Sequence, residues 1–155
     1  MGVTIMTQDD GESISMPCSS LNEFKDVLRN RYIKWIRYRF DENLPRVDGN
    51  EETTKEGYAY EFLKLLESYD PSHTTGELTK LCHTLAYHIH GAPGLLKFLD
   101  HSDCEGYHSV GDIMDIITTW EIISDGDFGR FTSKFEKLSE LWRHALKNNQ
   151  YVIYG

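Results

Sequence analysis

Residues 20–40 read SLNEFKDVLRNRYIKWIRYRF, and their periodicity decides the predicted fold. Ser20 and Glu23 have the spacing of a capping box, in which each side chain bonds a backbone N–H of the first helical turn. Apolar side chains then recur at intervals of three and four residues, which places them on one helical face; they are Leu21, Phe24, Leu28, Tyr32, Trp35 and Ile36. The stretch predicts an amphipathic helix over 21–40.

The same periodicity continues along the rest of the chain. It predicts helices over 53–69, 74–90, 110–124 and 128–148, and a short helix that starts at Pro93. Ser109 and Asp112 resemble the capping box that opens the helix over 110–124. Short connections between helices favour a bundle, so the predicted fold class is all-α, a single-domain bundle of about six helices with short extended segments at both termini.

The two ends of the chain read differently from the helices. Residues 1–19 are polar and are predicted to form an arm, with a short strand near Ile14–Met16, whereas residues 20–155 form a single helical domain. The last residues, Tyr151-Val152-Ile153-Tyr154, make a short apolar tail that can pair with the arm.

Composition excludes several classes of protein. The chain has 155 residues, 39% apolar side chains and nineteen aromatic residues, enough for a core, which excludes a disordered chain, a collagen-like chain and a disulfide miniprotein. No apolar run approaches the ~20 residues that span a bilayer. The first twenty residues lack the features of a secretory signal, and the cysteines Cys18, Cys82 and Cys104 show no disulfide framework. A cytoplasmic protein with reduced thiols is predicted.

The loop His101–Asp112 carries the strongest suggestion of a metal site. Counted from His101, its acidic residues fall at positions 3, 5 and 12 and Gly106 falls at position 6, as in an EF-hand calcium loop. The same loop spaces two histidines and a cysteine as H-x2-C-x3-H, which suits zinc. The candidate ligands are His101, Asp103, Cys104, Glu105, His108 and Asp112. A tight turn without a metal is the favoured interpretation, and calcium and zinc stay open as alternatives; the prediction is therefore of no cofactor.

This loop also carries a resemblance. The run FLDHSDCEG at 98–106, followed by a helix, a Trp-containing helix and the tail YVIYG, resembles a family of small bacterial helical proteins that share an HSDC(D/E)G run and whose function is unknown. The resemblance covers roughly residues 95–155. It implies a helical single domain and no activity that could be assigned to particular residues.

Basic residues are concentrated in one segment. Seven basic and three acidic side chains lie between residues 25 and 46, interleaved with Tyr32, Trp35, Tyr38 and Phe40. Basic and aromatic residues on one helix can hold phosphates and stack on bases. Arg29, Lys34 and Arg37 are the candidate nucleic-acid contacts. The favoured interpretation is that the aromatic residues belong to the core and the bases to the solvated face, so nucleic acid is an unlikely partner.

Acidic residues dominate elsewhere, with nine bases against 22 acids, and the whole chain carries a formal charge of −9. Complementary charge selects and accelerates a basic partner, and no Walker loop, HExxH or nucleophile elbow indicates an enzyme. We therefore expect an acidic protein-binding module, an immunity or inhibitor protein that neutralises a basic toxin or nuclease. The candidate contacts are Asp9, Asp10, Glu12, Glu51, Glu52, Asp125 and Asp127.

Overall fold

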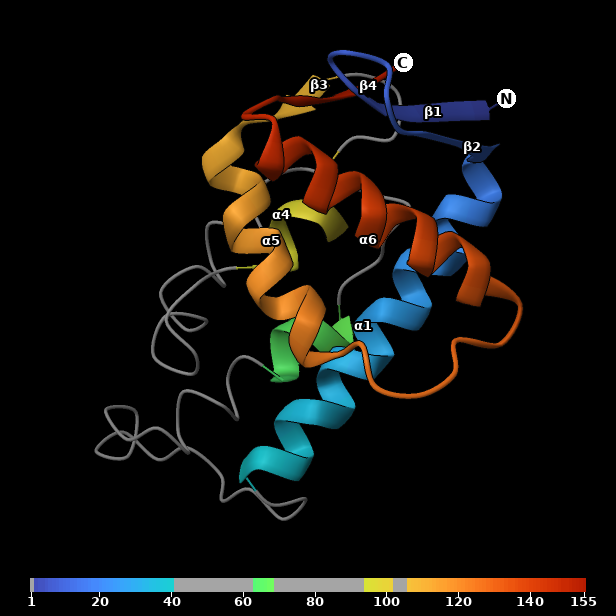
Figure 1. Cartoon of the computed structure of the whole chain (residues 1–155). Coiled ribbons are helices and arrows are strands. Elements are labelled where there is room, and N and C mark those ends of the chain that lie inside the picture. Colours follow the sequence, from blue (N-terminus) through green and yellow to red (C-terminus); the bar gives the residue numbers. More distant parts are fainter. Residues whose placement is uncertain (1, 41–62, 69–93, 102–105) are drawn as a thin grey trace.

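The computed structural model describes residues 2–40, 63–68, 94–101 and 106–155. A four-stranded antiparallel sheet lies at one end of the described part, where both chain termini are also found (Figure 1). Helix α1 (Cys18–Phe40) starts at the sheet and runs away from it. The protein is therefore mixed α/β in architecture.

The sheet joins the two ends of the chain. Its strands are β1 (Gly2–Thr7), β2 (Ser13–Pro17), β3 (Gly106–His108) and β4 (Val152–Tyr154), in the order β2-β1-β4-β3. Ile5 of β1 lies opposite Ile14 on one side and opposite Tyr154 on the other. Side chains alternate across a strand, so that Val3, Ile5 and Thr7 are buried while their neighbours are not.

The remaining described elements are helical. They are α4 (Leu96–Leu99), α5 (Val110–Ile122), the 3₁₀ turn η1 (Gly129–Phe131) and α6 (Thr132–Lys147), together with helical residues 63–68. The predicted capping box at α5 is confirmed, because Ser109 Oγ accepts the Asp112 backbone N–H and the Asp112 carboxylate accepts that of Ser109. The box predicted at Ser20 is wrong, because α1 already begins at Cys18.

Aromatic rings fill the core between the helices. Trp120 of α5 stacks on Phe135 at 4.5 Å and meets Phe98 and Trp142 edge-on. Its indole N–H donates to Ser139 Oγ at 2.7 Å, so the polar atom of this buried ring is satisfied. The core fixes α4, α5 and α6 around one point below the sheet.

The all-α prediction is wrong, because the four strands form a true sheet. Two parts of the sequence interpretation are confirmed: the strand around Ile14–Met16 and the pairing of the C-terminal tail with the N-terminal segment. The sheet was missed as an architectural layer because β3 and β4 are short and because β1 lies in the segment that was interpreted as a polar arm. β3 buries only His108 and β4 buries only Val152 and Tyr154, so neither repeats the alternation often enough to stand out.

Predicted helix boundaries agree best in the C-terminal half. The helix expected over 110–124 is α5, and the one expected over 128–148 is split into η1 and α6. The helix expected over 53–69 is confirmed at residues 63–68, whereas 53–62 and the whole of 74–90 lie outside the described residues. Among the described helices, none combines the length and apolar character that crossing a membrane requires.

Candidate functional site

An open groove lies between the C-terminal half of α1 and the end of α5. Its volume is about 520 Å³, and we call it the α1–α5 groove. Its lining residues come from two places: Arg31, Lys34, Trp35 and Tyr38 from α1, and Ile122, Ile123 and Asp125 from the end of α5 and the turn that follows. The four α1 residues are spaced i, i+3, i+4 and i+7, which puts them on one side of the helix. The groove therefore combines basic, aromatic and aliphatic surface.

Two of these side chains have no role in the fold that the structure reveals. Tyr38 is 89% exposed, the highest value for a large hydrophobic side chain in the described residues. Lys34 is also exposed, and among the described residues it has neither an ion-pair nor a hydrogen-bond partner. Both are available for contact with another molecule.

Arg31, by contrast, is fixed in position. Its guanidinium donates to the Ile123 carbonyl at 3.2 Å and lies 4.5 Å from the centre of the Phe128 ring. Gly126 has φ 89°, and a Cβ there would come within 3.3 Å of the guanidinium. This glycine lets the turn after α5 approach closely and hold a positive charge at the groove wall.

The other candidate nucleic-acid contacts are used within the molecule. Arg29 forms an ion pair with Asp26 one turn earlier in α1, and Arg37 forms one with Glu67. Of the three residues proposed from the sequence, only Lys34 lines the groove.

A smaller groove of about 280 Å³ is lined by the turn between α5 and α6 and by α6 itself. Asp127, a predicted partner contact, organises this turn, since its carboxylate accepts the Gly129 N–H at 2.6 Å and the Thr132 hydroxyl at 2.9 Å. These bonds hold the pKa of Asp127 below its usual value. Asp125 is exposed and lines the α1–α5 groove, so it is the member of the acidic set that reaches the site.

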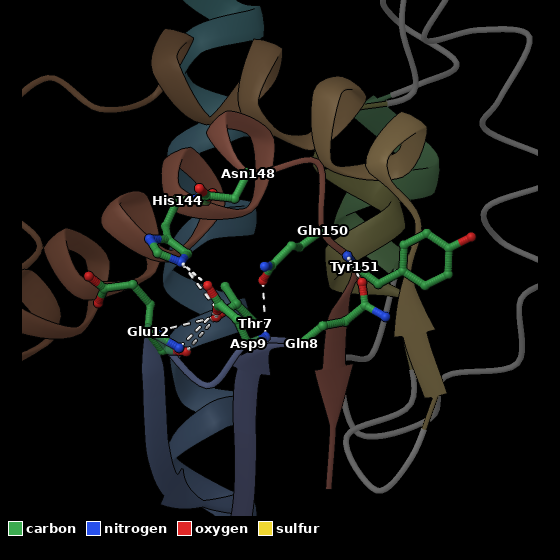
Figure 2. A network of polar contacts seen from close by, with 9 residues as sticks. Thr7, Gln8, Asp9, Glu12, His144, Asn148, Gln150 and Tyr151 are labelled. Atoms are coloured by element: carbon green, nitrogen blue, oxygen red, sulfur yellow. Dashed lines mark hydrogen bonds and ion pairs between the residues drawn. The ribbon is translucent and has the colours of Figure 1, made fainter.

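Asp9 belongs to a network that fastens the β1–β2 turn to α6 and β4 (Figure 2). Its carboxylate accepts the Thr7 hydroxyl at 2.6 Å and the Gly11 N–H at 2.9 Å, and lies 2.9 Å from His144 Nε2. The hydrogen bonds from Thr7, His144 and Gly11 hold the pKa of Asp9 well below its usual value. Asp9 is therefore an intramolecular acceptor.

Glutamine side chains complete this network. Gln150 Oε1 accepts the backbone N–H of Asp9, and Gln8 Oε1 accepts that of Tyr151 (Figure 2). The bonds connect the first and last segments of the chain directly. The network therefore holds the two ends of the chain together.

The other predicted acidic contacts are distributed unevenly. Asp10 is exposed in a left-handed turn with φ 58°, and Glu12 is half-buried. Glu51 and Glu52 lie outside the described residues. The described residues contain fourteen acidic and thirteen basic side chains, whereas the other segments contain eleven and three. The acidic surplus of the sequence therefore belongs almost entirely to segments outside the described structure.

His101 and His108 of the candidate metal loop lie together in an aromatic cluster. Their ring centres are 4.4 Å apart, and His101 also stacks on Tyr154 at 4.2 Å. His108 is buried, and its Nε2 bonds the Tyr154 hydroxyl at 2.9 Å. Burial, together with the nearby His101, lowers the pKa of His108 to about 3. The neutral imidazole of His108 in β3 is thus hydrogen-bonded to Tyr154 of the neighbouring strand β4.

Asp112, the last residue of the candidate calcium loop, has two structural partners. Its carboxylate caps α5 and lies 3.1 Å from Lys97 Nζ, which also pairs with Asp115 at 2.7 Å. Asp103, Cys104 and Glu105 lie outside the described residues. Within the described ranges, no group of three or more histidine, cysteine or acidic side chains gathers as a metal site would require.

Sequence reasoning missed the groove because it assigned Trp35 and Tyr38 to the core. A signal was present: the apolar stripe of α1 runs through Leu28, Tyr32 and Ile36, and Tyr38 falls to one side of it, next to Arg31 and Lys34 on the helical wheel. The contribution of Ile122 and Asp125 had no local signal, because it depends on how α5 packs against α1.

Comparison with known proteins assigns no family to the chain. A scan of protein-family models gives no match, and searches of the curated proteins and of the solved structures give no significant match. The resemblance of residues 98–106 to the HSDC(D/E)G proteins therefore stays a prediction.

Proposed function

We propose that the chain is a protein-binding module and that it holds its partner in the α1–α5 groove. One observation carries this proposal. The exposed Tyr38 and the unpaired Lys34 lie together in the lining of a groove of about 520 Å³. Tyrosine, tryptophan and arginine are enriched where proteins bind one another, and they supply most of the binding energy there. The groove contains all three residue types.

The charge of the described surface also bears on the partner. Its acidic and basic side chains are nearly equal in number, and Asp9 and Asp127 are engaged in internal hydrogen bonds. The described surface therefore gives no support to a basic toxin or nuclease as the partner. The proposal that a partner binds in the groove therefore depends on the side chains that line it and not on the net charge of the protein.

Site-specific photo-cross-linking tests the proposal. The full chain carries a benzophenone amino acid in place of Tyr38 or, as a matched control, in place of Tyr151, which is 43% exposed at the sheet. Both variants are expressed in the source cells and irradiated. We expect a discrete cross-linked product from position 38 and none from position 151.

Two ordinary substitutions test the same groove without a cross-linker. Tyr38→Ala and Lys34→Glu are expected to lose the partner identified from position 38, with thermal unfolding unchanged. A partner captured equally well from position 151, or retained by both groove variants, would show that the groove is not the docking site.

A further inference from the structure

We infer that the α1–α5 groove takes an acidic peptide segment of a partner protein, with a carboxylate at Lys34 and a neighbouring aromatic or branched aliphatic side chain against Tyr38 and Trp35. This inference rests on the proposed function and adds the chemistry of the partner. It reverses the charge that the overall composition suggests, because the groove is locally basic in a chain of net charge −9.

The cationic side of the groove is the first support. Lys34 and Arg31 line it, and neither has a carboxylate in salt-bridge contact: Lys34 is unpaired, and Arg31 bonds a backbone carbonyl and faces an aromatic ring. The carbonyl and the ring do not neutralise the guanidinium, and the Asp127 carboxylate attracts it without forming a salt bridge. A ligand that enters the groove meets two positive charges, against the carboxylate of Asp125 in the lining and that of Asp127 near Arg31.

The neighbouring bases of α1 show why this charge is notable. Arg29 and Arg37, which flank the groove residues in sequence, are both neutralised by carboxylates within the fold. Lys34 is exposed between them and free to attract a carboxylate from outside.

The apolar side of the groove supplies the second support. Trp35 is half-buried and stacks on Tyr32 with ring centres 6.3 Å apart, which restricts its orientation before any ligand binds. Ile122 is half-buried on the facing wall, and Tyr38 projects at the rim. Rigid aromatic surface of this kind binds apolar side chains without a large loss of conformational entropy.

A protein segment fits these features better than a nucleic acid does. Phosphodiester binding draws on several lysine and arginine contacts, whereas this groove offers one free lysine, one anchored arginine and an opposing carboxylate. A single acidic residue beside a single large apolar residue matches the number and the order of these groups along α1.

Selection from a phage library of short random peptides against the purified full chain tests this inference. Enriched peptides are synthesised with a fluorophore and titrated by anisotropy. We expect them to place Asp or Glu next to an aromatic or branched aliphatic residue. Lys34→Glu and Tyr38→Ala should each weaken binding about tenfold, as loss of a central interface contact does, while Lys147→Glu and Tyr151→Ala, at exposed positions near the sheet, should leave it unchanged.

A charge exchange makes the assignment specific. A peptide whose acidic residue is replaced by lysine should bind Lys34→Glu better than it binds the unmodified chain. Thermal unfolding of every variant, measured first, separates loss of binding from loss of structure.

The outcomes distinguish this inference from the proposal on which it rests. Basic or uncharged peptides that still depend on Tyr38 would overturn the acidic segment but keep the groove as a docking site. Peptides that ignore both variants, or no enrichment at all, would overturn both. Tyr38-dependent binding of a labelled oligothymidylate, tighter than that of any peptide, would instead identify single-stranded nucleic acid as the occupant.

Discussion

At the sheet end, Asp9 accepts hydrogen bonds from Thr7 and Gly11 and His108 bonds Tyr154, whereas at the α1–α5 groove Lys34 is unpaired and Tyr38 is 89% exposed. The sheet end joins segments from opposite ends of the chain, and their polar groups are occupied in holding them together. The groove is built on α1, a helix that its own backbone hydrogen bonds define. The exposed side chains of that helix at the groove, Lys34 and Tyr38, are not needed to hold it together, so the two regions should respond differently to substitution.

The largest effect is expected where the aromatic core meets the sheet. Trp142 is fully buried, lies against Phe98 and Trp120, and meets the His108 ring at 5.9 Å. Trp142→Ala removes these contacts and leaves a cavity, so the free energy of unfolding should fall by about 3–5 kcal/mol. Urea unfolding followed by far-ultraviolet circular dichroism measures this. A loss under about 1 kcal/mol would contradict the central position of this ring.

Acid should weaken the sheet end next. The folded state holds the pKa of His108 at about 3, below its ordinary value of 6.5, so between these values the unfolded chain binds a proton that the folded chain does not. Stability is therefore expected to fall as the pH drops through this window, by about 1.6 kcal/mol from pH 6.5 to pH 5 for this residue.

His108→Phe is the control for that prediction, because it keeps an aromatic ring and removes the titration. Urea unfolding at a series of pH values should show a flatter pH dependence for the variant than for the unmodified chain. Equal slopes would mean that His108 titrates normally in the folded protein. The histidines that do not touch His108 contribute equally to both curves, so the difference reports His108 together with its neighbour His101.

Substitution of Ser109, which follows β3 and precedes α5, should lower the free energy of unfolding by a smaller amount. Ser109→Ala removes the hydroxyl that accepts the Asp112 N–H at 3.2 Å, and loss of such a cap costs about 1 kcal/mol. The midpoint of urea unfolding reports this change. Ser109→Asn retains a side-chain acceptor, so it should recover most of the stability; an equal loss in both variants would show that the cap is unimportant.

The Ser109 cap also shows which parts of the fold were predictable. A capping box, a helical stripe or an apolar tail is a local pattern, and α5, most of α1 and the pairing of the tail with the N-terminal segment followed from such patterns. The sheet was missed because β3 and β4 have three residues each, too few to establish a period of two, and because the alternation of β1 lies in a segment interpreted as a polar arm.

The candidate site was harder to predict than the fold, for a similar reason. A side chain's charge can be read from the sequence, but its partner cannot. Asp9 and Asp127 looked like free acidic contacts until their acceptor roles were known, and Arg37 looked like a free base until Glu67 was placed beside it. Lys34 and Arg37 are both basic residues of α1. Only the packed structure shows that Arg37 has a carboxylate partner, Glu67, and that Lys34 has none among the described residues.

The smallest effect on stability is expected at the groove, where Tyr38→Ala should change the free energy of unfolding by no more than about 0.5 kcal/mol. The side chain is 89% exposed, so its removal exposes little buried surface and opens no cavity. Urea unfolding of this variant beside Trp142→Ala compares the two regions under the same conditions. A loss above about 1.5 kcal/mol would mean that Tyr38 supports the fold, and its exposure could then no longer be taken as a sign of partner binding. Unchanged stability with lost peptide binding is the combination that only a docking residue gives.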